Sequence, residues 1–274
     1  AIERDEPLDA EQRIVRPDGI EKVIYARGKV LRENGVAVKL IGTAQDITER
    51  KKQETFREQF IANAAHELRT PMTTLVGFVE MLSRKRSTMP ETQLQVVIDA
   101  MARSGDRLAV LINNLLDLSK LQQGELEFDL APVAVGEVLE TVKDSTPPPE
   151  GKSVEVSVQG EPVALADRHR LDQVVSNLLT NAYRYGGPTI RMEACETNGS
   201  VVVTVADDGE GIEAGLLTNL FDPFTRGAAS SEVGGSGLGL AIVKMLVDAS
   251  GGEIWHEPES PHGTRFNVRL KRPS

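Results

Sequence analysis

Apolar residues in the central part of the chain recur every seven positions, between Ile47 and about Gln122. In the first segment one row is Ile61, Leu68, Leu75 and Leu82, and the other is Ala65, Met72 and Val79. In the second segment the rows are Leu94, Met101, Leu108 and Leu115, and Val97, Ser104, Leu111 and Leu118. This spacing predicts two long helices, each with an apolar seam. The loop KRSTMPE separates them, and Pro90 is placed to open the second helix.

The two predicted helices form an antiparallel hairpin that cannot cover all of its own apolar surface. Two helices of this length bury only one seam between them. Two hairpins paired in a four-helix bundle give both seams a common core. We therefore expect the chain to form a homodimer.

The flanking segments have a different pattern. In residues 1–46, the β-like runs EKVIYARGKVL and VAVKLIGTAQD are joined through Asn34-Gly35, a hairpin turn signal. Two strands alone are marginally stable, so this segment is expected to be the tail of a larger β-domain. In residues 125–274, strand-like runs alternate with two helical ones, RHRLDQVVSNLLTNAYRYG and GLGLAIVKMLVDASGG. The alternation, with a hairpin at Asn198-Gly199, predicts a two-layer α/β sandwich with a mixed sheet.

Composition narrows the class of protein. The chain has 274 residues, 40% of them hydrophobic, and a formal net charge of −10, which disfavours nucleic-acid binding. The lone Cys195 rules out an internal disulfide and fits a reducing compartment. The sequence contains no apolar run of about 18 residues, so it predicts no membrane span. We expect a cytoplasmic chain. Because it starts at Ala1, we expect a piece of a longer protein, whose missing part could hold a membrane anchor.

The motif HELRTP lies on the first helix. His66 falls outside the heptad seam, so it is expected to point to solvent, with Thr70 on the same face. Glu67 could orient the imidazole or accept its proton. Pro71 removes the helical partner of the Glu67 carbonyl and tends to kink the helix. These residues alone are more typical of an ordinary surface histidine beside a structural kink.

Three glycine clusters and two asparagines follow. DDGEGI (207–212), GGSGLGL (234–240) and HGT (262–264) lie at loops beside predicted elements, and the second opens a helix. Backbone N–H groups before a helix favour an anion, which suggests a polyphosphate site. The pattern fits neither a P-loop nor a dinucleotide fingerprint, and it could mark only tight turns. Asn177 and Asn181 share a helix face, where an amide oxygen could ligate Mg²⁺ or simply face solvent. Asp207 could accept a hydrogen bond from an exocyclic amine, or it could be an ordinary turn residue. Trp255 is expected in the core or on the sheet surface.

Taken together, the motifs resemble the transmitter region of sensor histidine kinases over about residues 47–274. HELRTP is similar to the H box, NLLTNAYRYG to the N box, DDGEGI to the first glycine box, FDPF (221–224) to the F box and GGSGLGLAIV to the second glycine box. Their order and spacing match too, which outweighs the structural alternatives for each motif alone. The resemblance implies a signalling helix and a dimerisation and phosphotransfer hairpin at 47–122. It implies an ATP-binding domain, of the type shared with gyrase and heat-shock chaperone ATPases, at 125–274.

The resemblance also implies roles for single residues. His66 would be the phospho-acceptor, and Glu67 and Thr70 fit an E-x-x-T pattern for regulator dephosphorylation. Asn181 would ligate Mg²⁺, with Asn177 nearby. Asp207 would read the adenine amine, and Tyr185 would pack near the base. Arg184 would contact phosphate, where many relatives have lysine. The remaining nucleotide contacts would come from Gly209, Gly211, Gly235, Gly237, Leu238 and Gly239. Residues 222–236 would form a mobile lid.

The implied function is ATP-dependent autophosphorylation of His66 and transfer of the phosphoryl group to a response-regulator aspartate, with phosphatase activity toward that regulator.

Residues 1–46 end in GTAQDITERKKQE, which is similar to the end of a PAS sensor domain. One alternative is a conformational ATPase of the same superfamily, but its hydrolytic members carry a glutamate base where this chain has Asn177. A second alternative is a non-catalytic dimeric scaffold, against which the intact nucleotide motifs argue.

Overall fold

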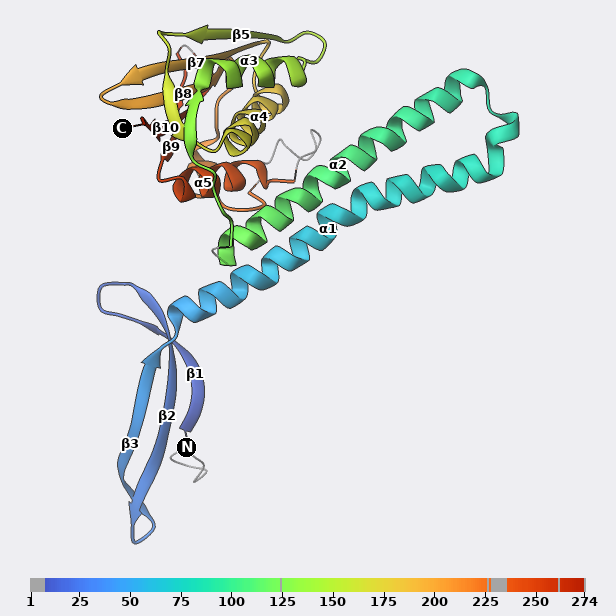
Figure 1. Ribbon diagram of the computed structural model, residues 1–274. Helices are drawn as coiled ribbons and strands as arrows, with labels where there is room; N and C mark the ends of the chain where they lie inside the picture. The colour runs from blue at the N-terminus through green and yellow to red at the C-terminus, as the bar shows by residue number, and fades with distance from the viewer. Residues whose placement is uncertain (1–7, 124, 226, 228–235, 261, 274) are drawn as a thin grey trace. The chain divides into compact units, whose positions relative to one another are not determined.

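The computed structural model describes residues 8–273 except 124, 226, 228–235 and 261, and only the backbone of 56, 87 and 122. The chain divides into two compact units, Ala1–Ala65 and His66–Ser274, and the boundary falls inside the first helix (Figure 1). No helix of the described part is long and apolar enough to cross a membrane.

The first unit holds a three-stranded antiparallel sheet in the order β1-β2-β3. Its strands are β1 (Leu8–Val15), β2 (Glu21–Glu33) and β3 (Val36–Asp46). Asn34 and Gly35 both have positive φ, 51° and 82°, as the predicted hairpin turn requires. Strand β1 was not predicted, because most of its residues are exposed and its polarity does not alternate. It pairs with β2 over its whole length.

Two long helices follow, α1 (Thr48–Lys85) and α2 (Glu91–Gln123), joined through a short 3-10 helix, η1 (Arg86–Thr88). Helix α1 continues through Pro71, which is buried. In the single chain, one predicted row of α2 is buried at Val97, Leu111 and Leu118, whereas Met72 and Val79 of α1 are more than half exposed. A single copy therefore leaves part of the heptad pattern uncovered.

The rest of the second unit is the predicted two-layer sandwich. Its helices α3 (Val135–Ser145), α4 (Arg168–Tyr185) and α5 (Gly239–Ala249) cover one face of the sheet (Figure 1). The sheet has the order β5-β7-β8-β10-β9, made of β5 (Ser153–Val158), β7 (Thr189–Thr197), β8 (Ser200–Asp207), β10 (Thr264–Lys271) and β9 (Glu253–Pro258). Strands β5 and β7 are parallel and the other pairs antiparallel, so the sheet is mixed. A separate ladder joins β4 (Ala131–Ala134) to β6 (Val163–Ala166), and a 3-10 helix, η2 (Ala214–Asn219), follows β8.

Helix α3 and strand β4 were missing from the sequence-based assignment. Four residues of α3, Val135, Val138, Leu139 and Val142, are buried and follow the spacing of an amphipathic helix. That periodicity was available in the sequence. Helix α4 buries a longer apolar stripe that includes Leu171, Leu178 and Ala182. This stripe fixes the rotation of α4 and therefore the direction in which its polar face points.

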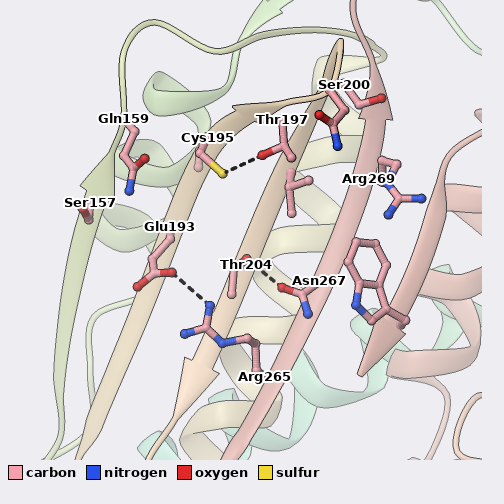
Figure 2. A pocket seen from close by; sticks show the side chains of 14 residues that line it. Ser157, Gln159, Glu193, Cys195, Thr197, Ser200, Thr204, Arg265, Asn267 and Arg269 are labelled. Carbon is pink, nitrogen blue, oxygen red and sulfur yellow. Dashed lines mark hydrogen bonds and ion pairs between the residues drawn. The ribbon is translucent and has the colours of Figure 1, made fainter. Parts of the chain in front are cut away.

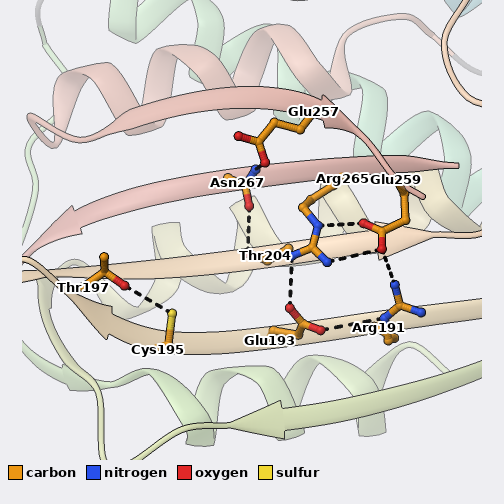
Figure 3. A network of polar contacts seen from close by, with 9 residues as sticks. All are labelled: Arg191, Glu193, Cys195, Thr197, Thr204, Glu257, Glu259, Arg265 and Asn267. Carbon is orange, nitrogen blue, oxygen red and sulfur yellow. Dashed lines mark hydrogen bonds and ion pairs between the residues drawn. The ribbon is translucent and has the colours of Figure 1, made fainter. Parts of the chain in front are cut away.

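The outer face of the sheet, opposite the helices, carries a network of polar pairs (Figure 3). Arg265 Nε and Arg191 Nη2 each donate to the Glu259 carboxylate at 2.7 Å, and Arg265 Nη1 donates to Glu193 at 3.2 Å. The hydrogen bond from Arg265 is the main reason why the pKa of Glu259 lies below its usual range. The Glu259 N–H donates to the Gly263 carbonyl, so the network also fixes the loop between β9 and β10.

Glu259→Gln should destabilise this domain by about 1–2 kcal/mol at pH 7, because both arginines lose a charged acceptor. A lowered folded-state pKa stabilises the fold above the unfolded-state pKa of about 4.3, and this stabilisation is lost as pH falls through the folded-state pKa. The difference between native and variant protein should therefore begin to close as the pH falls below about 4. Trp255, the only tryptophan, lies on β9, so thermal unfolding followed by its fluorescence reports on this domain.

Glu253→Gln is the matched control. Glu253 of β9 is paired with Arg269 of β10 on the same sheet, but both side chains are about half exposed, so the loss should be small. Equal destabilisation by the two substitutions, or a Glu259 effect that does not shrink as the pH falls below about 4, would contradict this account.

Candidate functional site

A hollow of about 550 Å³ opens at the edge of the sandwich where β8 ends, a volume typical of small-molecule sites. Helix α4 contributes Asn181, Arg184 and Tyr185 to its lining. The segment after β8 contributes Asp207 and Gly211, and the start of α5 contributes Gly237 and Gly239. The structure thus brings together most of the predicted nucleotide residues, which lie as much as 58 positions apart in the sequence (181 to 239).

Asp207 is the buried acid of this hollow, with 8% of its surface exposed. One carboxylate oxygen, Oδ1, accepts from the Gly209 N–H at 2.9 Å. Burial raises the pKa of Asp207, although the backbone N–H groups of Gly209 and Thr264 oppose that shift. Gly209 thus holds the carboxylate instead of lining the hollow. A buried carboxylate with one oxygen anchored is suited to accept a hydrogen bond from a ligand amine.

Close packing fixes the position of Asp207. A Cβ on Gly186 would lie 2.5 Å from the Asp207 Cβ, and one on Gly263 would lie 1.9 Å from the Asp207 carbonyl oxygen. Gly186 ends α4, as predicted, but its φ is −80°, so it does not use the left-handed conformation common at helix ends. Glycine is required at position 186 because β8 passes too close for any side chain.

The N-terminus of α5 faces the polar side of α4. A methyl group on Gly239 would lie 3.5 Å from Asn177 Oδ1 and 3.8 Å from Asn181 Oδ1. Leu238, just before the helix, is fully buried, and its N–H donates to the Ser236 hydroxyl at 3.3 Å. The free N–H groups of a helix N-terminus attract phosphate. Two amide oxygens beside such a site are suitable ligands for a hard cation such as Mg²⁺. Among the described residues, no cluster of three acidic, histidine or cysteine side chains could hold a metal alone.

The backbone before α5 is constrained at Phe224 and Gly237. Phe224 has a φ of 65°, which is rare for a bulky residue, and its N–H donates to the Gly237 carbonyl at 2.8 Å. Gly237 has a φ of 66°, and a Cβ there would lie 2.7 Å from the Phe224 Cα. The predicted contact of Gly235 and most of the predicted lid at 222–236 lie outside the described residues.

His66 lies on α1, and its side chain is 75% exposed, in agreement with its place outside the seam. Its Nδ1 is 3.9 Å from Glu67 Oε1, which is too long for a hydrogen bond. The Thr70 hydroxyl donates to the His66 carbonyl at 3.4 Å and not to the ring. The imidazole is therefore accessible, and in this conformation neither neighbour orients it.

A second hollow of about 650 Å³ lies on the outer face of the sheet (Figure 2). Its charged side chains are paired: Arg265 with Glu193 and Glu259, and Arg269 with Glu253. Arg269 also covers the ring of Trp255 at 4.8 Å, which places this tryptophan on the sheet surface, one of the two places that the sequence left open. Asn267 and Thr204 are buried and hydrogen-bonded to each other at 2.8 Å. These charged and buried polar groups are hydrogen-bonded or paired with other protein side chains. We therefore assign the functional site to the hollow beside Asp207.

Sequence reasoning missed the apolar part of the functional hollow, which comes from Ile212, Leu216, Leu220, Leu240 and Phe266. Phe266 also packs edge-to-face on Phe221 of the FDPF motif, with ring centroids 6.5 Å apart. The glycine and asparagine motifs drew attention to polar contacts. The apolar residues carried no signal beyond their hydrophobicity.

Comparisons with known proteins agree with this geometry. Residues 56–124 match the family model described as His Kinase A (phospho-acceptor) domain. Residues 166–274 match the model described as Histidine kinase-, DNA gyrase B-, and HSP90-like ATPase. The autoinducer 2 sensor kinase/phosphatase LuxQ of Vibrio parahaemolyticus is 32% identical over 270 residues, which covers 93% of this chain and 31% of LuxQ.

Two solved structures share the fold. The structure of full-length ShkA in complex with AMPPNP is 27% identical, with a TM-score of 0.56 over 78% of this chain and 45% of ShkA. The structure of histidine kinase ThkA in complex with response regulator protein TrrA has a TM-score of 0.58 over 99% of this chain and 80% of ThkA, at 22% identity. The chain spans between 28% and 48% of the length of the first curated relatives that it matches.

Gly186→Ala should weaken nucleotide binding at least tenfold, because the new methyl group would displace Asp207 or the end of α4. Isothermal titration calorimetry with ADP measures the affinity. Trp255 fluorescence during thermal unfolding checks that the variant is folded.

Gly215→Ala is the control, since that glycine also lies near the hollow, in η2, but nothing lies within 4 Å of its added methyl group. Its ADP affinity should match that of the native protein. Native affinity in a folded Gly186→Ala variant would show that Asp207 tolerates a side chain at the end of α4.

Proposed function

Since the chain belongs to the sensor histidine kinases, whose phospho-acceptor and ATPase domains it carries in succession, we propose that it phosphorylates His66 from ATP and passes the phosphoryl group to a response regulator. The observation that supports this most directly is the hollow itself. It combines a buried acid, Asp207, with a helix N-terminus at Gly239 that faces two asparagine amides.

Each part of this hollow suits one part of ATP. The Asp207 carboxylate would accept from the adenine amine, and Tyr185, which is half exposed, would pack near the base. The α5 N-terminus around Gly237 and Gly239 would hold the phosphates, with Arg184 as an added cation. Asn181, with Asn177 nearby, would hold Mg²⁺, which offsets phosphate charge when it is bound. Positioning and charge neutralisation are what phosphoryl transfer chiefly needs.

The transfer step uses the exposed imidazole of His66. A ring nitrogen would attack the γ-phosphorus, the bond from that phosphorus to the β–γ bridging oxygen would break, and ADP would leave with those electrons. The attacking nitrogen is the one that carries no proton, and the proton on the other nitrogen can pass to Glu67. Glu67 Oε1 lies 3.9 Å from His66 Nδ1, so this proton transfer would need a shorter contact than the present one.

The regulator step is proposed from the same motif. ThkA is described in complex with a response regulator, and LuxQ is named a kinase/phosphatase. By analogy, phosphohistidine at position 66 would pass its phosphoryl group to a regulator aspartate. Thr70 lies one turn beyond His66, where its hydroxyl could position water for the reverse, hydrolytic reaction on the phosphorylated regulator.

A homodimer is part of the same proposal. Besides Met72 and Val79, the apolar residues Val76 of α1 and Val96 and Val110 of α2 are more than half exposed in the single chain. Pairing with a second hairpin would bury such residues in a four-helix core. We keep 47–122 as the dimerisation and phosphotransfer part, 125–274 as the ATP-binding domain, and 1–46 as the end of a PAS-like domain.

His66→Gln should abolish covalent labelling by γ-labelled ATP while leaving ADP affinity unchanged, because the substitution removes the nucleophile and not the nucleotide site. The label on the native protein should be acid-labile and base-stable, as a phosphohistidine is. Steady ATP hydrolysis by His66→Ala would instead favour a conformational ATPase. Absence of nucleotide binding in the native protein would favour a scaffold.

Thr70→Ala should separate two activities. The variant should label His66 within about twofold of the native rate, because the threonine hydroxyl donates only to a backbone carbonyl. It should lose most of its dephosphorylation of a phosphorylated regulator, since that step needs a positioned water. Loss of both activities to the same extent would rule out this division of roles. Thr74→Ala is the control, because Thr74 makes the same kind of backbone hydrogen bond one turn later, at 3.1 Å.

A further inference from the structure

Lys152 lies in the loop between α3 and β5 and reaches the carboxyl end of α4. Its Nζ donates to the Gly186 carbonyl at 2.7 Å and to the Ala182 carbonyl at 3.4 Å. The Ala182 carbonyl also accepts the Gly186 N–H at 2.9 Å. Lysine is favoured at such a place because the last carbonyls of a helix carry partial negative charge. Here the lysine comes from a distant part of the chain and not from the helix itself.

The turn that Lys152 holds is the turn that shapes the nucleotide hollow. Asn181, Arg184 and Tyr185 lie on it and line the hollow, whereas Lys152 does not. Gly186, which accepts the shortest hydrogen bond from Lys152, is the residue packed against the Asp207 side chain. A change at Lys152 can therefore reach the base-binding acid through one intervening residue.

Lys152 also acts on Asp207 through its charge. Burial raises the pKa of Asp207, and the neighbouring Asp208 raises it further. The backbone N–H groups of Gly209 and Thr264 lower that pKa, and the charge of Lys152 lowers it by a smaller amount. Of the other charged groups nearby, His262 acts on Asp208, and Arg184, Glu210 and Glu213 line the same hollow.

We propose that Lys152 is a positioning residue for base selection, which holds the last turn of α4 against Asp207 so that the site takes adenine in preference to a 6-oxopurine. The chemistry depends on ionisation of the acid. A carboxylate accepts from the adenine amine and repels a carbonyl oxygen, whereas a protonated carboxyl can donate to that oxygen. This inference rests on the proposed nucleotide function and extends it to a residue outside the hollow.

The test compares ADP with IDP, which has a carbonyl where ADP has the amine. Calorimetry on the whole chain gives both affinities between pH 8 and pH 5.5. Lys152→Met should weaken ADP binding about tenfold and IDP binding much less, so the ratio of ADP affinity to IDP affinity falls. The ratio should fall further as pH drops, and more steeply than in the native protein, because the variant acid protonates more readily. Lys152→Arg should restore the ratio.

Two further variants keep the test decisive. Lys152→Gln can still donate to the Gly186 carbonyl but carries no charge, so it should retain the fold and show the same pH-dependent fall in the ratio. Lys143→Met removes a partly exposed lysine of α3 that pairs with Glu140, and it should behave as the native protein.

Equal losses of ADP and IDP affinity with an unchanged pH profile would overturn the inference, because a simple helix cap would produce that result. Asp207→Asn distinguishes this failure from failure of the proposed function. If Asp207→Asn leaves the ADP-to-IDP ratio unchanged, Asp207 does not read the base and the assignment of the hollow is wrong. If Asp207→Asn lowers the ratio and both uncharged Lys152 variants do not, only the role of Lys152 is refuted.

Discussion

The close approach of the end of α4 to the end of β8 is the constraint on which the nucleotide site depends. Asp207 can stand at the base of the hollow only because position 186 has no side chain. The same approach puts the polar face of α4 within reach of the turn at Gly239, which is proposed to bind phosphate. A larger residue at 186 would separate the acid from the asparagines, and a single ligand could no longer contact both.

This approach is held from both layers of the sandwich. On the helical side, Lys152 binds the last carbonyls of α4. On the sheet side, Asp208 Oδ1 accepts the Thr189 N–H at 2.9 Å, the main reason why the pKa of Asp208 is lowered. Burial drives the pKa of Asp207 in the opposite direction. The two adjacent carboxyls thus have different roles. Asp208 connects the end of β8 to β7, and Asp207 is proposed to bind a ligand.

The sequence predicted the larger elements well because periodicity and turn chemistry are local. Heptads identified α1 and α2, and Asn-Gly pairs identified both hairpins. Strand β1 was missed because most of its residues are exposed and its sequence shows no sustained alternation, although its partner β2 follows directly after a short turn. Among the site residues, Asn181 and Asp207 could be found from motifs. Lys152 could not, because its partners lie 30 and 34 positions away and its neighbours in sequence form an unremarkable turn.

The acceptor differs from the nucleotide site in its degree of order. Asp207 is buried and anchored, so in the proposed site the cost of orienting the base is met when the domain folds. His66 is exposed, with neither Glu67 nor Thr70 bonded to its ring. Exposure has a physical advantage here, since in the proposed cycle the same imidazole must meet ATP at one step and a regulator aspartate at the next. A ring fixed by its neighbours would suit one of those partners at the expense of the other, so we expect its orientation to be set by whichever partner is bound.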